Sequence, residues 1–300
     1  MGDPGGVGPE VVVAALADPR VQESVEPLVL GDRRVFELAA ALRGVPAPGR
    51  SLREVFSLSD RPTLREMGAA ALAYVDAGID AVLAGEARAL CTAPLSKHRV
   101  SLAAPGFQGH TEHLAARTGA RVAMMMAGPR LRVVLATNHL ALSEVPHQLT
   151  TEQLGFVVQL TARTLRERFG IESPRIAVCG LNPHAGDGGL FGDEEARLIT
   201  PAIEEARRAG VLVFGPLAAD GLFPRAVLGA CDAVVALYHD QGLIPAKLLD
   251  FRETVNVTLG LPFARTSPDH GTADDIAGKG VADAEPMVSA LLLAARLGKG

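Results

Sequence analysis

Short apolar runs alternate with amphipathic stretches along most of the chain. Seven runs of four to seven residues, rich in Val, Leu, Ile and Ala, predict buried strands. These runs are 27–30, 89–92, 122–126, 131–137, 175–178, 233–238 and 254–258. Apolar residues on a period of about 3.6 predict helices. The helices are expected at 34–42, 64–84, 151–169 and 194–209. This alternation predicts an α/β fold in which helices cover mostly parallel sheets.

The length of 300 residues is about twice that of an ordinary domain, so two lobes or one large domain are expected. The stretch 44–62 is rich in turn-forming residues and predicts a surface connection. Apolar residues make up 48% of the chain and aromatic residues 4%, which indicates a core built from Ala, Val and Leu. The three cysteines lie far apart in apolar surroundings, which favours buried thiols over disulfides or a zinc motif.

The charge pattern disfavours several classes of partner. The net charge is −5 and no run of Lys or Arg exceeds two residues, so no nucleic-acid partner is expected. No apolar run approaches the length of a membrane span, and no secretory signal follows Met1. A cytoplasmic protein without a membrane partner is therefore expected.

Polar segments interrupt the scaffold, and in this fold class ligands bind where loops leave the carboxyl ends of strands. The segment 2–10, GDPGGVGPE, has four glycines and leads into an apolar helix. Such a turn suits an anion or a dinucleotide at a helix N-terminus, although glycines before a helix also form plain tight turns. The tail 256–280 mixes polar side chains with glycines, which predicts a binding loop.

Three histidines follow predicted strands directly or after a short turn. They are His139, His184 and His239. Three neutral imidazoles suit Zn²⁺ or Co²⁺, and an open fourth position would make the ion a Lewis acid. The spacings of 45 and 55 residues match no local metal motif, so hydrogen-bonded histidines remain the alternative reading of the spacing. Only four lysines occur beside 25 arginines, which draws attention to Lys97 and Lys247 within polar segments.

These segments together closely resemble the 4-hydroxythreonine-4-phosphate dehydrogenase family of pyridoxal phosphate biosynthesis. The resemblance covers essentially the whole chain, and seven segments occur in the family's order. The segments are GDPGGVGPE, TAPLSK, GFQGHTEHLA, TNH, LNPHAGDGG, LYHDQGL and NVTLGLPFARTSPDHGTA. Seven matches in register are not expected by chance.

A second resemblance concerns the fold. The segments GDPGGVGPE and HGTADDIAGKG are similar to GDGIGPE and HGSAPDIAGKG of isopropylmalate dehydrogenases. This implies a two-lobed α/β/α fold like that of isocitrate and isopropylmalate dehydrogenases. A cofactor-side lobe is expected at 1–105 plus 266–300, and a lobe for metal, substrate and dimerisation at 106–265. NAD or NADP would be bound by Gly5, Gly6, Gly8, His270, Gly271 and Asp275.

The resemblance also assigns roles to individual residues. It implies that His139, His184 and His239 hold one divalent ion, Zn²⁺, Co²⁺ or Mg²⁺. It places the substrate contacts on His110, Thr111, Lys247, Asn256 and Arg265. Catalytic candidates are Asp240, Asp269 and Lys247, and the sequence does not separate the two aspartates as proton acceptor. In the family the site is shared across a homodimer, so a homodimer is expected.

The implied reaction is the oxidation of 4-phosphooxy-L-threonine by NAD⁺ or NADP⁺ and its decarboxylation to 3-amino-2-oxopropyl phosphate. Relatives that act on 4-phospho-D-threonate, 4-phospho-D-erythronate or an aromatic dihydrodiol share the same motifs and remain alternatives. A non-catalytic phosphometabolite-binding protein is a further alternative, which the three histidines and the glycine-rich segment disfavour. Family members normally begin with a β-strand ahead of the glycine-rich segment, whereas Met1 directly precedes Gly2 here. The stability of the first lobe is therefore expected to suffer more than the active site.

Overall fold

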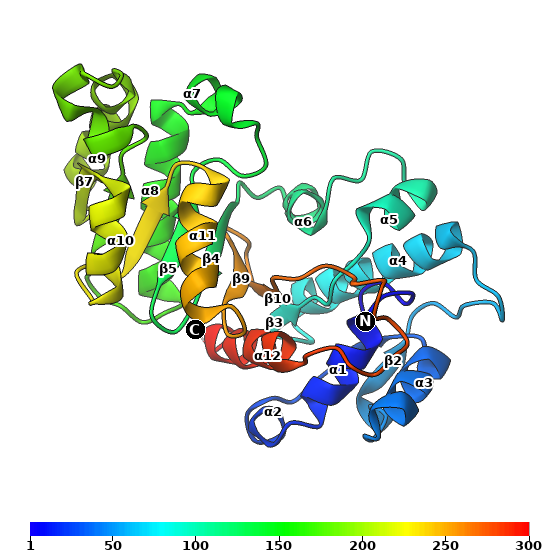
Figure 1. Cartoon of the computed structure of the whole chain (residues 1–300). Helices are drawn as coiled ribbons and strands as arrows, with labels where there is room; N and C mark the ends of the chain where they lie inside the picture. Colours follow the sequence, from blue (N-terminus) through cyan, green and yellow to red (C-terminus); the bar gives the residue numbers. More distant parts are fainter. Residues whose placement is uncertain (300) are drawn as a thin grey trace. The chain divides into compact units, whose positions relative to one another are not determined.

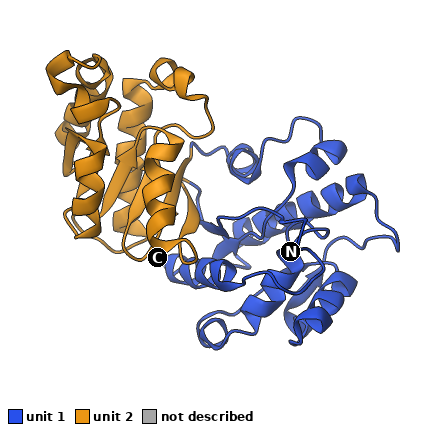
Figure 2. Cartoon of the chain, in the orientation of Figure 1, with its two compact units in different colours: residues 1–121, 261–299 blue, residues 122–260, 300 orange. Residues whose placement is uncertain are grey.

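The computed structural model describes residues 1–299, which form two compact units (Figure 2). Unit 1 comprises Met1–Arg121 and Leu261–Lys299, and unit 2 is the intervening segment 122–260. The boundaries differ from those expected for the lobes, since unit 1 extends to residue 121 and resumes at residue 261. His110, Thr111 and Arg265 therefore belong to unit 1, although the expected boundaries group them with the metal ligands.

Unit 1 contains two small parallel strand pairs covered by helices (Figure 1). Strand β1 (Val29–Gly31) pairs with β2 (Leu52–Glu54), and β3 (Ala89–Cys91) pairs with β10 (Ala264–Pro268). The helices are α1 (Gly8–Leu16), α2 (Pro19–Ser24), α3 (Arg33–Arg43), α4 (Leu64–Leu83), α5 (Lys97–Ala103), α6 (His110–Thr118) and α12 (Glu285–Leu297). Helix α4 contacts β1 and β3, whereas α12 contacts β3 and β10.

Local side-chain caps define where the helices of unit 1 begin. Asp32 accepts a hydrogen bond from the backbone N–H of Val35 at the start of α3, and Thr63 accepts one from Glu66 at the start of α4. Each cap satisfies a backbone donor that has no partner inside the helix. The second carboxylate oxygen of Asp32 also accepts from the N–H of Leu58, so the same side chain holds the connection between α3 and α4.

Unit 2 is a six-stranded sheet between two helical layers. Its strands are β4 (Ala123–Ala127), β5 (Arg132–Leu135), β6 (Ile176–Cys179), β7 (Val213–Leu217), β8 (Ala233–Ala236) and β9 (Val255–Leu259), in the order β9-β4-β5-β8-β6-β7. Strands β5, β8, β6 and β7 are parallel, whereas β4 is antiparallel to both β5 and β9. The sheet is therefore mixed, and three of its five strand pairs are parallel, in agreement with the expected mostly parallel pairing.

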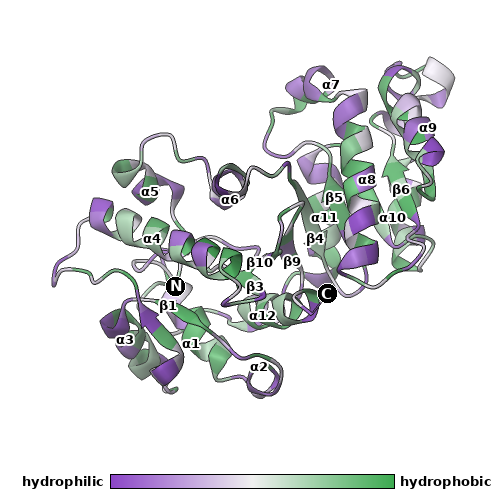
Figure 3. Cartoon of the chain, turned by 180° about the vertical axis from the view of Figure 1, so that it is seen from behind, coloured by the Kyte–Doolittle hydropathy of each residue, from purple (hydrophilic) through white to green (hydrophobic). Residues whose placement is uncertain are grey.

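Helices cover both faces of this sheet. Helix α8 (Thr151–Glu167) packs on the sheet beside α9 (Thr200–Arg208), while α10 (Ala219–Val227) and α11 (His239–Asp250) pack against β8. The short helix α7 (Val145–Gln148) precedes α8. Figure 3 shows mostly hydrophobic strands β4, β5 and β6 beside helices whose hydrophobic and hydrophilic residues alternate. Central strands buried on both faces explain the continuous apolar runs in the sequence.

All seven predicted strands are confirmed, with ends shifted by up to two residues, and three strands were missed. Strand β2 lies within the predicted surface connection, and β7 follows α9. Strand β10 lies within the tail that was expected to be a loop, so Arg265 and Ser267 are in a buried strand instead. This strand was not predicted because its sequence is polar. The polar side chains of Arg265 and Thr266 are buried and form hydrogen bonds inside the fold.

The helix expected at 194–209 is a π-helical turn, Glu195–Ile199, followed by α9. Among residues 1–299, no helix is both long and apolar enough to cross a membrane.

Candidate functional site

His139 and His239 follow neighbouring strands and lie close together. Thr137, after β5, donates a 2.6 Å hydrogen bond from its hydroxyl to the carbonyl of Leu237, after β8. The two strand ends are thereby joined two residues before each histidine. The imidazole ring centres are 5.5 Å apart.

This pair fits one divalent ion. Two imidazoles that bind a Zn²⁺ ion at about 2.1 Å place their ring centres roughly 5–6 Å apart. Nδ1 of His239 lies 2.7 Å from a carboxylate oxygen of Asp240. When Nδ1 donates this hydrogen bond, Nε2 is the nitrogen that remains for a metal, the arrangement by which carboxylates orient metal-binding histidines.

His184 lies on a different loop, after β6, and is exposed. Residues 184–188 all have positive φ angles, including His184 and Ala185 at 54° and Asp187 at 43°. A left-handed backbone costs side-chain-bearing residues free energy, so the surrounding structure must hold it. Glu195 does so: it is 6% exposed, and one carboxylate oxygen accepts 2.8 Å hydrogen bonds from the backbone N–H groups of both Leu181 and Asn182.

Within residues 1–299 of a single chain, no group of three ligands suitable for a metal ion forms. The chain itself brings together two of the three predicted ligands, His139 and His239. The third, His184, follows β6, the other neighbour of β8 in the sheet. All three therefore lie at the carboxyl ends of adjacent parallel strands, as the sequence predicted, without converging on one point.

Gln241 connects the loops that carry His239 and His184. Its side-chain carbonyl accepts a 2.7 Å hydrogen bond from the N–H of Leu237, and its amide nitrogen donates a 2.8 Å bond to the carbonyl of Gly180. One side chain thus bridges the ends of β8 and β6. The sequence analysis missed Gln241 and Glu195, although an amide two residues after His239 was the available signal for the first.

The other predicted residues of unit 2 lie on the same sheet and helix. Lys247 is half-buried on α11, the helix that begins with His239. Asn256 is half-buried on β9, and its Nδ2 donates a 3.6 Å hydrogen bond to the sulfur of Met124. Its buried Oδ1 has no hydrogen-bond partner among the described residues. A buried amide oxygen without a partner is costly, which makes Asn256 suited to accept a bond from a ligand.

Arg265 is a buried cation of unit 1. Its side chain lies on β10, is 2% exposed, and donates a 2.6 Å hydrogen bond to the hydroxyl of Thr92. Burial lowers the pKa of its guanidinium to about 10, while Cys91 and Glu112 favour the charged form. A charge held in this environment is already desolvated and interacts strongly with an anion.

His110 and Thr111 begin helix α6, and both are half-buried. Burial lowers the pKa of the His110 imidazole well below 6.5, and the positive charge of Arg265 acts in the same direction. The buried Nε2 of His110 has no hydrogen-bond partner in the described part of the chain. Gly109 has a φ of 150°, and a Cβ there would lie 3.1 Å from the Lys97 side chain, which shows how closely the segment passes. The His110 imidazole, the cations Arg265 and Lys97 and the carboxylate of Glu112 therefore lie in the same part of unit 1.

The two glycine-rich segments predicted to bind the cofactor pack against each other within unit 1. The N–H of Val7 donates a 2.9 Å hydrogen bond to the carbonyl of Thr272, and a Cβ on Gly6 would lie 2.8 Å from the Thr272 side chain. Glu10 is 3% exposed and accepts from the N–H groups of Gly278 and Gly280 at 2.6 and 2.9 Å. Residues up to 270 positions apart in the sequence are thus joined, and the two segments predicted to bind the cofactor are neighbours in the fold.

An ion-pair network also connects the same two segments. Asp3 is fully buried, and its carboxylate lies 3.1 Å from Arg99, which also contacts Asp274 at 2.7 Å. The other carboxylate oxygen of Asp3 accepts from the N–H of Gly5. Sequence reasoning missed Arg99, because its two acidic partners lie far away in the chain.

The remaining residues predicted to bind the cofactor are His270, Gly271 and Asp275, which lie in the second of these glycine-rich segments. Nδ1 of His270 lies 3.0 Å from the carbonyl of Gly271, and its buried Nε2 has no hydrogen-bond partner among residues 1–299. Gly271 and Asp275 are exposed. The unsatisfied ring nitrogen and the close glycine packing fit a polar ligand such as a dinucleotide.

The two candidate proton acceptors lie in different units. Asp240 is in the first turn of α11, and its side chain is 73% exposed. Asp269 is half-buried directly after β10. The positions of Asp240 and Asp269 therefore do not identify which of the two is the base.

A family model described as pyridoxal phosphate biosynthetic protein PdxA matches residues 24–294. The chain belongs to the PdxA family. This confirms the resemblance on which the site residues were assigned, and membership implies a dehydrogenase with a nicotinamide cofactor and a divalent metal ion.

Individual members of the family match over almost the full chain. A 4-hydroxythreonine-4-phosphate dehydrogenase of Desulfosudis oleivorans is 48% identical over 98% of this chain and 93% of that protein. The crystal structure of a 4-hydroxythreonine-4-phosphate dehydrogenase from Klebsiella pneumoniae aligns with a TM-score of 0.89 at 38% identity, over 99% of this chain and 98% of that one.

A terephthalate 1,2-cis-dihydrodiol dehydrogenase from Burkholderia xenovorans aligns with a TM-score of 0.69 at 30% identity, over 99% of this chain and 96% of that one. The family thus shares its fold with an enzyme whose name indicates a different substrate.

Proposed function

We propose that this chain oxidises and decarboxylates 4-phosphooxy-L-threonine with NAD⁺ or NADP⁺, giving 3-amino-2-oxopropyl phosphate. The names of the similar dehydrogenases support this substrate. The observation that carries the proposal is the buried guanidinium of Arg265, which lies near the half-buried imidazole of His110 and the exposed Lys97 and suits a small multiply charged anion. The metal would be held by His139, His239 and His184, and when bound it would polarise the oxygen at the reacting carbon.

The chain's own residues would bind and orient the substrate. Arg265 offers a fork of N–H donors to phosphate or carboxylate, and Lys97 and Lys247 offer point charges. The low pKa of His110 keeps its imidazole neutral at pH 7, so its Nε2 can either accept or donate one hydrogen bond to the substrate. Asn256 presents an unpaired amide oxygen, which is suited to the substrate's ammonium group.

The experiment that tests the function is a substrate panel. NADH and NADPH formation and CO₂ release are measured with 4-phosphooxy-L-threonine, 4-phospho-D-threonate, 4-phospho-D-erythronate and a cis-dihydrodiol. Each assay is repeated after chelation and after return of Zn²⁺, Co²⁺ or Mg²⁺. Turnover of the first substrate only, lost on chelation, is the expected result.

Turnover of another acid, or of the dihydrodiol, would show that the chain acts on the substrate of a related dehydrogenase instead. Binding of the phosphorylated acids without any NADH or NADPH would contradict the enzyme and indicate a phosphometabolite-binding protein. Unphosphorylated 4-hydroxythreonine is the matched control, since its use at equal efficiency would remove the role of Arg265.

We further propose a homodimer in which the second copy supplies the third metal ligand. His139 and His239 are neighbours within one chain, whereas His184 is exposed and apart from them. His184 of the partner is therefore the ligand that would complete the site.

Mixed dimers test this arrangement. Unfolding and refolding an equal mixture of His184→Ala and His239→Ala should restore about a quarter of the activity, because half of the dimers are mixed and each has one intact site. The matched control is a mixture of His139→Ala and His239→Ala, whose defects lie in the same half-site and should not complement. If activity recovers only in the control mixture, His139 and His239 of one site belong to different chains, and the proposed arrangement is wrong.

A further inference from the structure

Helix α6 carries His110 and Thr111, the predicted substrate contacts at its start, yet little of the helix is buried. The structure describes all nine residues of α6, and Leu114 alone among them is buried. Loops flank the helix on both sides (Figure 1). Most helices in proteins are stabilised by packing of an apolar face, so a helix with one buried side chain depends more on its polar contacts.

Two side chains of α6 contact helix α4 through hydrogen bonds and ion pairs. Nε2 of His113 lies 2.7 Å from Oδ1 of Asp76. Arg117 donates from one guanidinium nitrogen to the same oxygen of Asp76, and from the other to Asp80 at 2.6 Å. The two residues on each helix are four positions apart, so they lie on one face of that helix. These four residues form the α4–α6 cluster.

Asp76 is the centre of this cluster. Its side chain is 33% exposed and contacts both His113 and Arg117, whereas the side chain of Asp80 is 65% exposed. The ring of Phe107 lies 5.8 Å from the His113 imidazole, centre to centre, and partly shields the contact from solvent. An isolated exposed ion pair contributes little to stability, but charges that form a network contribute more. Loss of Asp76 should therefore weaken the attachment of α6.

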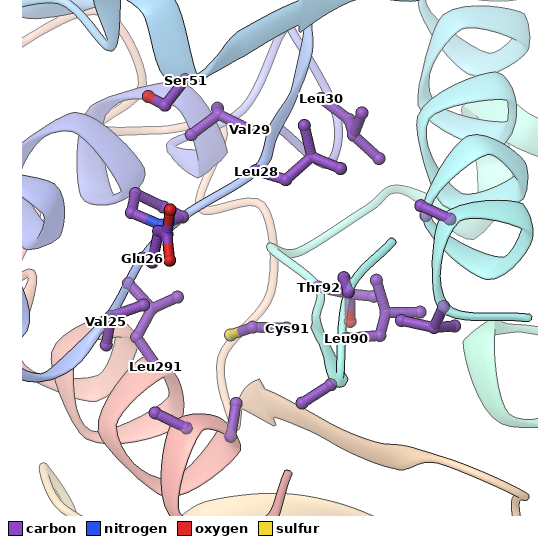
Figure 4. A pocket seen from close by; sticks show the side chains of 18 of the residues that line it. Val25, Glu26, Leu28, Val29, Leu30, Ser51, Leu90, Cys91, Thr92 and Leu291 are labelled. Atoms are coloured by element: carbon purple, nitrogen blue, oxygen red, sulfur yellow. The ribbon is translucent and has the colours of Figure 1, made fainter. Parts of the chain in front are cut away.

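Helix α4 is a firm support for the cluster. Nine of its twenty residues are buried, against one of nine in α6. One side of α4 faces a cavity of about 790 Å³ within unit 1 (Figure 4). The residues of α4 that line it include Tyr74, Val75 and Gly78. A Cβ on Gly78 would lie 2.7 Å from the side chain of Leu90, so α4 packs closely on strand β3.

The cluster lies on the opposite side of α4. At about 100° per residue, positions 76 and 80 point roughly 170° away from the mean direction of positions 74, 75 and 78. The inner side of α4 therefore fixes this helix in unit 1, and its outer side presents Asp76 and Asp80 to α6.

The cluster is directly connected to His110. His113 follows His110 by three residues, so the two imidazoles share a face of α6. Burial, the charge of Arg265 and the charge of His113 all lower the pKa of the His110 imidazole. A contact that holds His113 therefore also determines where the ring of His110 lies. Displacement of a binding group by about 1 Å can lower activity by up to about 100-fold.

We propose that Asp76 is a positioning residue, which holds α6 so that His110 and Thr111 meet the substrate. It acts through its contacts with His113 and Arg117 and not on the substrate itself. The inference rests on the proposed function, because the substrate contacts of α6 are part of that proposal.

The test compares Asp76→Asn, Arg117→Gln and the double variant with the native chain. Asp76→Asn should raise KM for 4-phosphooxy-L-threonine by about tenfold, because α6 is less well positioned. KM for the cofactor should stay within about twofold, since the cofactor segments are held by other contacts. Amide exchange in α6, followed by mass spectrometry, should become about fivefold faster, as the loss of a partly buried ion pair predicts.

Three further variants separate positioning from a general effect on the fold. The double variant should show the same KM as Asp76→Asn alone, because the two side chains act through one contact. Asp76→Glu keeps the carboxylate and should recover most of the native KM. The matched control is Asp60→Asn, which breaks an exposed ion pair with Arg34 elsewhere in unit 1 and should change neither KM nor exchange in α6.

Unchanged exchange in α6 of Asp76→Asn would overturn the proposal, and so would faster exchange with an unchanged KM for the substrate. Additive effects of the two substitutions would also contradict it. If the native chain oxidised no acid of the panel, the proposed function would fail on its own. The NMR signal of the His110 imidazole would then decide whether Asp76 positions this ring: it should shift in Asp76→Asn and not in Asp60→Asn, and an unchanged signal would reject the role.

Discussion

In unit 2 the three predicted metal ligands follow the ends of strands, whereas in unit 1 the predicted substrate-binding residue Arg265 lies inside the fold. His139 is exposed and the side chain of His239 is 36% exposed, and the strand ends that carry them are joined by the hydrogen bond from the Thr137 hydroxyl to the carbonyl of Leu237. Arg265, by contrast, is 2% exposed and held by Thr92.

The difference in exposure suits what each group is proposed to bind. Metal ligands must lose their protons and be reached by an ion from solvent, so exposure is compatible with their task. An anion is bound more strongly where water has already been removed, so the burial of Arg265 during folding would contribute to the affinity for a phosphate or carboxylate.

The largest expected effect is at the exposed pair. His139→Ala or His239→Ala should lower kcat/KM by about 10³-fold or more, because a bound metal supplies several kcal/mol of charge stabilisation. The thermal midpoint should stay within about 2 °C, since exposed side chains contribute little to stability. Steady-state kinetics with a melting curve checks both. His147→Ala, also at an exposed histidine, is the control and should retain activity.

A smaller effect is expected from the buried arginine. Arg265→Lys should raise KM for the phosphorylated substrate by about 100-fold, because a point charge cannot reproduce the bidentate fork and leaves buried hydrogen-bonding groups unsatisfied. Substrate titration measures this, and the exposed Arg50→Lys is the matched control. An unchanged KM in Arg265→Lys would show that this charge is structural.

The buried amino group of Met1 predicts a pH dependence of stability. Its pKa is 8.0 ordinarily and about 5 in the fold, so between pH 5 and 8 the unfolded chain binds the proton and the folded chain does not. Stability should therefore rise with pH across this window by about 1.4 kcal/mol per pH unit, and the penalty should be complete below pH 5. Denaturant unfolding of the free and the N-terminally acetylated chain measures it. Equal slopes in the two forms would contradict the prediction.

The smallest effect is expected at the bridge between β8 and β6. Gln241→Ala removes hydrogen bonds to Leu237 and Gly180 and should lower kcat/KM by about tenfold, as positioning changes near metal ligands commonly do. Metal affinity measured by calorimetry should fall in parallel. Gln148→Ala, at an exposed glutamine, serves as control and should change neither. A fall in stability without a fall in metal affinity would make the bridge purely structural.

The strands of unit 2 were predictable because they are buried on both faces and read as continuous apolar runs. Strand β10 was not predictable, since its buried side chains are polar and form hydrogen bonds with Thr92 and with the backbone of α12. Antiparallel β4 was found as a strand, but its direction depends on pairing with β5 and β9, which no local pattern encodes.

In the candidate site, too, some features could be predicted from local sequence and others depend on the fold. The position of His239 after β8 could be predicted, because a polar residue following an apolar run marks a strand end. Its 5.5 Å approach to His139 depends on the order β5-β8 in the sheet. Glu195 and Arg99 could not be identified, because each acts on backbone or side chains that the fold brings from distant segments.

By itself, the sequence determined the family, the α/β class and the residue types at the strand ends, since these depend on local apolar runs and on motifs of consecutive residues. Only the tertiary structure decided which of those residues meet. It paired two of the three histidines and buried Arg265 near His110. These outcomes depend on sheet order and on the desolvation of particular groups, which are properties of the packed chain and not of any segment alone.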